Sequence, residues 1–236
     1  MNAPANSGSL YFNYKGTFSI VLMAVADADL RFIMVDIGAY GRNSDGGVFA
    51  HSKFGKALTK GDLPLPPSRL LPNGADLGLM PYVFVGDEAF PLPEHLMRPY
   101  PGRGVTEDQQ IYNYRLSRAR RVVESAFGIL AARWRIFHTK IGVSPQTSKD
   151  VVKATVVLHN LLQTDTTAST HVNVLDGVGE SKANGLRPLR GIGTRGSFCA
   201  YQIRSNYKEY FSRLNTVPWQ HERVRRGRFA SRSNTS

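Results

Sequence analysis

The sequence has a single cysteine, Cys199, among 236 residues. One cysteine excludes a disulfide framework within the chain and a zinc site built from several cysteines, and it favours a reducing compartment. The longest clean apolar run, residues 20–26, is far shorter than the roughly 20 residues that a membrane helix needs. The N-terminal residues carry neither the charged nor the apolar stretch of a secretion signal. These absences predict an intracellular protein without a membrane span.

Negative charge is also scarce, because 30 lysines and arginines face 18 aspartates and glutamates. The net charge is +12 and the isoelectric point is near 10. Such an excess suggests a polyanionic partner, although a solvated basic surface explains the charge equally well. The hydrophobic content of 42% is enough for a packed core, so global disorder is excluded.

Short apolar runs alternate with helical patterns, which predicts a mixed α/β fold. Two strands over 18–26 and 31–38 should form a hairpin, the first strand being buried on both faces, and a helix capped by Asn43 or Ser44 should follow. We expect a loop over 59–80. The remaining predicted elements are a strand over 81–86 and helices over 109–137, 147–163 (capped by Thr147 or Ser148) and 200–214.

Three carboxylates stand at element boundaries that favour chemistry. Asp45 opens a predicted helix, Asp87 closes a predicted strand, and Glu124 flanks the apolar stripe of the long helix. Together they could bind Mg²⁺ or Mn²⁺, which take oxygen ligands, and two such ions can promote phosphodiester cleavage. Each also has a plainer interpretation. Asp45 could only provide a favourable charge at a helix N-terminus, Asp87 could be a turn aspartate, and Glu124 could form an ion pair within its own helix.

Basic side chains cluster on or just after the long helix, where Glu124 is the only acidic residue within 110–140. Five of them are candidate contacts to a DNA backbone: Arg115, Arg118, Arg121, Arg133 and Arg135. Other candidates are weaker. His159 is expected to be a core histidine, and Trp134 and Trp219 are expected to belong to the core.

Several motifs, taken together, resemble the PIF/Harbinger-type transposase family and its nuclease-like relatives. They are S-G-S-L-Y-F-N-Y-K-G-T-F, G-R-N-S-D-G-G-V-F, V-G-D-E-A-F-P-L, V-V-E-S-A-F-G-I-L, V-L-H-N and Y-F-S-R-L-N-T-V-P-W-Q. The resemblance implies a ribonuclease-H-like DDE domain, a mixed sheet flanked by helices, that acts on DNA with Mg²⁺ or Mn²⁺. Position by position, Asp45, Asp87 and Glu124 match the metal-binding carboxylates, with Asp87 and Glu124 as catalytic residues. It further implies a nuclear location, alone or shared with the cytoplasm, and a Myb-like companion protein.

The family has a further aspartate in an Asp-Gly-Thr motif on its first, central strand, and the expected place for that strand lies upstream of Met1. We therefore expect an N-terminally truncated domain with impaired cleavage, or a domesticated non-catalytic module that binds DNA or protein. The expected organisation is a DDE domain over 1–163, a flexible linker over 164–199, a docking helix over 200–220 and a basic tail over 221–236.

Overall fold

The computed structural model describes residues 1–102, 104–166 and 196–225. The chain divides into two compact units, each made of two segments that are distant in sequence. The first unit combines Met1–Ser52 with Arg121–Leu186, and the second combines Lys53–Arg120 with Arg187–Ser236. The long helix α3 (Glu107–Arg133) contributes its first part to the second unit and its last part to the first.

The first unit contains the predicted hairpin. Strand β1 (Ile20–Ala26) pairs in antiparallel register with β2 (Phe32–Tyr40), and Ala24 lies opposite Val35. The turn is held by Asp27, whose Oδ1 accepts from the backbone N–H groups of Asp29 and Arg31. Strand β1 is half-buried along its whole length, so the expectation of burial on both faces was wrong.

Two helices of the first unit begin at serine caps. Ser44 caps α1 (Asp45–His51), as expected, by accepting from the N–H of Gly47 at 3.2 Å. Helix α4 (Pro145–Thr166) begins two residues before the predicted start. The hydroxyl of Ser144 accepts from the N–H of Thr147 at 3.1 Å, so the cap is Ser144 and not Thr147 or Ser148. Proline suits the first helical position, where its missing N–H costs nothing.

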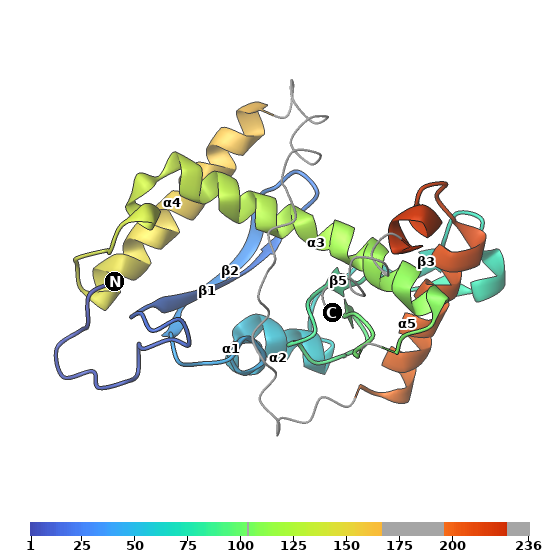
Figure 1. Cartoon of the computed structure of the whole chain (residues 1–236), viewed down its shortest axis with the longest axis horizontal. Coiled ribbons are helices and arrows are strands. Elements are labelled where there is room, and N and C mark those ends of the chain that lie inside the picture. The colour runs from blue at the N-terminus through green and yellow to red at the C-terminus, as the bar shows by residue number, and fades with distance from the viewer. Residues whose placement is uncertain (103, 167–195, 226–236) are drawn as a thin grey trace, which may run out of the picture. The chain divides into compact units, whose positions relative to one another are not determined.

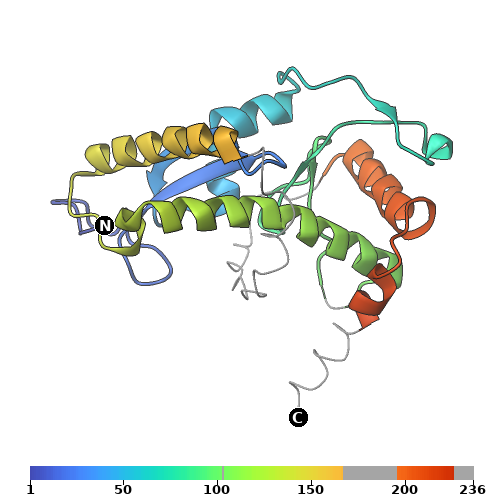
Figure 2. The same ribbon diagram turned by 90° about the horizontal axis from the view of Figure 1, so that it is seen from above.

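Helix α4 lies beside the hairpin (Figures 1 and 2). Phe32 of β2, Ala126 and Leu130 of α3, and Val152 and Val156 of α4 form the buried core of this unit. The final turn of the predicted 109–137 helix is separate: after Trp134 the chain forms a 3₁₀ turn, η2 (Arg135–His138). Trp134 packs against this core, as expected.

The second unit contains short elements. Helix α2 (Lys53–Lys60) comes first, and β3 (Arg69–Leu70) pairs in antiparallel register with β4 (Leu79–Met80) on either side of the 3₁₀ turn η1 (Ala75–Leu77). The expected loop over 59–80 therefore has structure of its own. The expected 81–86 strand is reduced to β5 (Phe84–Val85), parallel to β6 (Leu96–Met97).

The C-terminal helix completes the second unit. Helix α5 (Phe198–Glu209) is capped by Ser197 and runs into the π-helical turn η3 (Tyr210–Leu214). Ala200 and Ile203 of α5 pack against Met97, Tyr112 and Leu116 in the buried core of this unit.

The described residues thus form a mixed α/β structure whose sheets each have two strands. Most of the predicted linker, 167–195, and the end of the predicted basic tail, 226–236, lie outside the described residues. Within the described ranges, no helix is long and apolar enough to cross a membrane.

Candidate functional site

Asp45 is in the first turn of α1, in the first unit. The hydroxyl of Ser44 caps this helix by accepting from the N–H of Gly47. A carboxylate is stabilised there by the positive end of the helix dipole. Asp45 is therefore a half-buried carboxylate at the positive end of a helix dipole. This position is compatible both with metal binding and with simple stabilisation of the helix.

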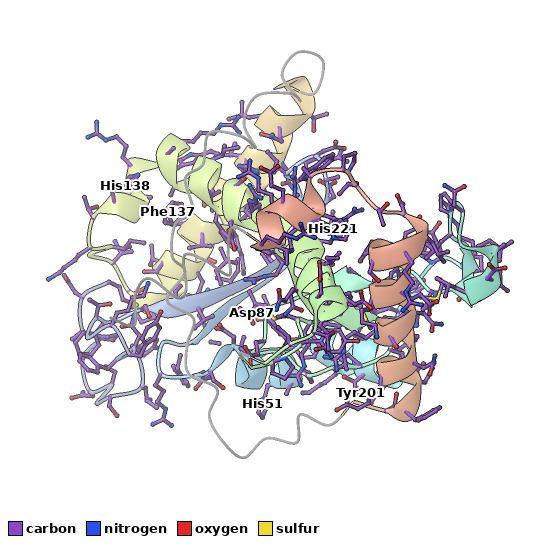
Figure 3. The ribbon with its side chains drawn as sticks, turned by 45° about the vertical axis from the view of Figure 1, so that its right-hand side comes forward. His51, Asp87, Phe137, His138, Tyr201 and His221 are labelled. Carbon is purple, nitrogen blue, oxygen red and sulfur yellow. The ribbon has the colours of Figure 1, made fainter. Side chains whose placement is uncertain are left out.

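Asp87 lies two residues after the end of β5, in the second unit, and is labelled in Figure 3. Its Oδ1 accepts from the N–H of Ala89 at 3.0 Å, and its Oδ2 lies 3.8 Å from Nη2 of Arg120. The side chains of Asp87 and Arg120 remain 35% and 26% exposed. Asp87 thus organises a turn and pairs with an arginine of α3, while keeping solvent access to its carboxylate.

Glu124 is exposed on α3, one turn beyond Arg120. It belongs to the first unit with Asp45, whereas Asp87 belongs to the second. Carboxylates of this kind suit Mg²⁺ or Mn²⁺ in ligand type. Across the described ranges, however, no three His, Cys, Asp or Glu side chains gather into a group that could hold a metal ion. Because the three carboxylates are divided between the two units, the metal site stays a prediction.

The five candidate DNA-contacting arginines divide into two sets. Arg115 and Arg118 contact the C-terminal segment of the second unit. The Arg115 guanidinium lies 4.9 Å from the ring centroid of Phe211 and donates weakly to Oε1 of Gln220 at 3.4 Å. Burial lowers the pKa of Arg115, and the nearby charge of Arg118 lowers it further. Arg115 therefore has an internal structural role, whatever it contributes to DNA binding.

The other set lies in the first unit. Arg133 and Arg135 are exposed at the end of α3 and in η2, and Arg121 is half-buried on α3. Exposed guanidinium groups on a helix can contact successive phosphates of a nucleic acid. Arg118 of the second unit is also exposed, so exposure does not separate the two sets.

Two helix side chains fix the hairpin to α4. Nε2 of His159 lies 2.8 Å from the carbonyl oxygen of Leu30, so this nitrogen carries the proton that is donated. Asn160 accepts from the N–H of Phe32 at 2.9 Å and donates to its carbonyl at 2.8 Å. His159 is a buried core histidine, as expected. Asn160 was missed, although the V-L-H-N motif that contains it is visible in the sequence.

Trp219 is the clearest departure among the aromatic residues. It is 43% exposed, so the expectation that it belongs to the core was wrong. The Arg118 guanidinium lies 5.5 Å from the centroid of its ring. The preceding proline and the following basic residues were the available sequence signals for a surface position.

Comparison with known proteins adds a family. Residues 1–160 match the family described as DDE superfamily endonuclease. The chain is 32% identical over 169 residues to "Protein ALP1-like" of Arabidopsis thaliana, an alignment that covers 69% of this chain and 40% of that protein. The chain therefore spans less than half the length of this curated relative. No solved structure matches the chain.

Proposed function

Because this chain belongs to the DDE superfamily of endonucleases, we propose that it acts on DNA as a nuclease-type domain. The match over residues 1–160 carries the proposal, because it includes Asp45, Asp87 and Glu124. The family resemblance drawn from the motifs is confirmed by this match and by the relative from Arabidopsis. We further propose that the domain is ribonuclease-H-like, in keeping with the mixed α/β structure.

DNA binding is the part of this function that the described geometry supports best. Arg121, Arg133 and Arg135 present positive charge on one helix and the turn that follows it. Neutralising phosphates with such side chains releases counterions, so binding should weaken steeply as salt rises. Arg115 and Arg118 belong to the second unit and stay candidate contacts there.

Cleavage would require Asp45, Asp87 and Glu124 to hold Mg²⁺ or Mn²⁺, with Asp87 and Glu124 as catalytic residues. A bound divalent cation would supply activation of a water molecule and stabilisation of the leaving oxygen. The ligand types support this assignment, whereas the described residues assemble no group of three ligands. Cleavage therefore requires more of the structure than DNA binding does, because it needs three carboxylates at one metal site.

A nicking assay on supercoiled DNA tests cleavage, with Mg²⁺ or Mn²⁺ present. We expect Glu124→Gln and Asp87→Asn to lower nicking by about a hundredfold or more, as loss of a group that stabilises the transition state does. Asp150→Asn is the matched control, since Asp150 is an exposed carboxylate of α4 outside the family motifs. If the parent nicked DNA and Glu124→Gln nicked it equally well, the assignment would be wrong.

A non-catalytic DNA- or protein-binding module is the second candidate. It is favoured by Asp87, whose carboxylate is engaged with Arg120 and the N–H of Ala89. Salt-dependent DNA binding that needs no divalent cation and survives Asp87→Ala, without nicking, would select this candidate. Binding that requires Mg²⁺ and Asp87 would select the nuclease.

The family resemblance also implies a nuclear location, or one shared with the cytoplasm, and a Myb-like companion protein. We carry both as proposals. Imaging a tagged full chain with and without such a companion tests them together: nuclear accumulation that depends on the companion is expected, and distribution unaffected by it would contradict the partnership.

A further inference from the structure

Trp219 presents a large ring to solvent from a fixed backbone. It stands in the turn before a short helical segment, 220–225, and its carbonyl accepts from the N–H of Arg223. The next residue, Gln220, is completely buried and holds this turn in place. Its Nε2 donates to the carbonyl of Phe211 at 3.0 Å, and its Oε1 accepts from the N–H of Val217 at 3.3 Å. The exposed ring is therefore preorganised, and no reordering of this turn is needed for it to meet a partner.

Positive charge surrounds this ring. The Arg118 guanidinium lies 5.5 Å from its centroid, and Arg223 follows one helical turn later on the same side of the short helix. Residues 210–225 contain three arginines and one acidic residue, Glu222. His221, labelled in Figure 3, lies 3.5 Å from Oε1 of Glu107, so part of the acidic charge of α3 is engaged at this segment.

An exposed indole between arginines has the chemistry of a base-stacking platform. Aromatic rings stack on any of the bases, because every base has a π-face, and flanking guanidinium groups attract the phosphates. A base within a duplex has both faces covered by its neighbours, so it must be unpaired to stack on a protein side chain. The partner that fits is a single-stranded stretch of nucleic acid.

We propose that Trp219, between Arg118 and Arg223, is a stacking platform for an unpaired base of a DNA strand. This inference rests on the proposed action on DNA and makes it more specific, since it separates single-strand binding from duplex binding. The platform would hold a strand that has left the duplex.

Tryptophan fluorescence tests the platform directly in the full chain. Trp134→Phe leaves Trp219 as the only indole, because the sequence has two tryptophans. A 15-nucleotide oligo(dT) should quench this fluorescence, and a 15-base-pair duplex should not. Trp219→Ala should weaken oligo(dT) binding by about tenfold to a hundredfold and leave duplex binding within about twofold, and Trp219→Phe should restore part of the loss.

Tyr82→Ala is the matched control. Tyr82 is 40% exposed, belongs to the same unit and lies 5.6 Å from the Arg69 guanidinium, so it copies the ring exposure and the arginine contact of Trp219. We expect this substitution to change neither binding reaction. An equal loss in Tyr82→Ala and Trp219→Ala would show nonspecific loss of apolar surface and would overturn the platform.

The two proposals fail separately in this design. Duplex binding that persists without quenching by oligo(dT) overturns the platform and leaves the action on DNA standing. Quenching by oligo(dT) without duplex binding contradicts the proposed contact with duplex DNA. If Trp219→Ala did not fold, the Trp134→Phe and Trp219→Phe titrations would still decide the result, because absence of quenching in Trp134→Phe alone overturns the platform.

Discussion

The two units use the same hydrogen-bonding device at very different sequence separations. In the first unit, Asn160 binds both the N–H and the carbonyl of Phe32, which is 128 residues away. In the second, Asn113 binds both the N–H and the carbonyl of Tyr100, at 2.8 and 3.0 Å, and the separation is 13 residues. Each asparagine belongs to a helix and satisfies two backbone groups of one aromatic residue, so each joins a helix to a non-helical segment.

The packing around these two asparagines differs. The first unit buries mainly aliphatic side chains between the hairpin, α3 and α4. The second buries a network of rings, in which Tyr112 contacts Tyr100 at 5.3 Å and Phe211 at 6.2 Å between centroids. Arginines cover this network: Arg204, 6% exposed, lies 4.0 Å from the centroid of Tyr100. The core of the first unit thus forms by packing of a regular hairpin against helices. In the second unit, contacts among aromatic rings and arginines connect the short elements.

Replacing the central ring of the second unit should have the largest effect. Tyr112 is completely buried, so Tyr112→Ala should lower the free energy of unfolding by about 3–5 kcal/mol. Urea denaturation measures the loss, and hydrogen exchange should rise in the second unit more than in the hairpin. Tyr112→Phe is the control, because it keeps the ring. An equal rise of hydrogen exchange in both units would contradict the claim that Tyr112 stabilises mainly the second unit.

Removing the asparagine clamps should have a smaller effect. Asn160→Ala leaves the N–H and carbonyl of Phe32 without these partners, which should cost about 1–3 kcal/mol, and Asn113→Ala is the matched change at Tyr100. Hydrogen exchange should accelerate at Phe32 in the first variant and at Tyr100 in the second. Exchange at Phe32 that is unchanged in Asn160→Ala would show that the hairpin does not depend on this clamp.

Acid should have the smallest effect, and only through the first unit. Burial lowers the pKa of His159 below its usual 6.5; the hydrogen bond to Leu30 opposes this shift, and the charge of Arg133 adds to it. The imidazole therefore takes up a proton more readily in the unfolded chain than in the folded one. The free energy of unfolding should be highest above pH 6.5 and should fall as the pH drops from 6.5 through the lower pKa of the folded state. Thermal unfolding between pH 7.5 and 5 should show less acid sensitivity in His159→Gln. The same sensitivity in both proteins would contradict this assignment.

The regular parts of the fold could be predicted from the sequence. The runs around β1 and β2 and the apolar spacing of α3 and α4 are strong local patterns, and the hairpin and both helices follow from them. Of the two-residue strands, β5 was predicted as part of a longer strand, whereas β3, β4 and β6 were not predicted. Two residues show no periodicity and form a strand only where the surrounding chain supplies a partner. The cap at Ser144 was missed for a different reason: the later hydroxyls of Thr147 and Ser148 compete for the same pattern.

The secondary-structure elements that carry the candidate site residues were largely predictable, whereas the contacts of these residues were not. The motifs locate Asp45 at a helix start and Glu124 on a helix, where the structure has them, and Asp87 at a strand end, which the structure places two residues earlier, at Val85. Sequence could not show that Asp87 organises a turn beside Arg120, because that contact depends on the approach of two segments. It also could not show that Asn160 reaches Phe32, since an asparagine carries no sign of its distant partner.

The most direct test of the central claim, action on DNA through its backbone, is the salt dependence of duplex binding. The logarithm of the association constant should fall linearly with the logarithm of the salt concentration. Arg121→Gln, Arg133→Gln and Arg135→Gln together should reduce the slope by roughly 3, about one per lost phosphate contact. The matched triple variant at Lys53, Lys56 and Lys60, exposed on α2, removes the same charge and should change the slope far less. Equal slopes in the parent and the arginine variant, or binding that is insensitive to salt, would contradict the account.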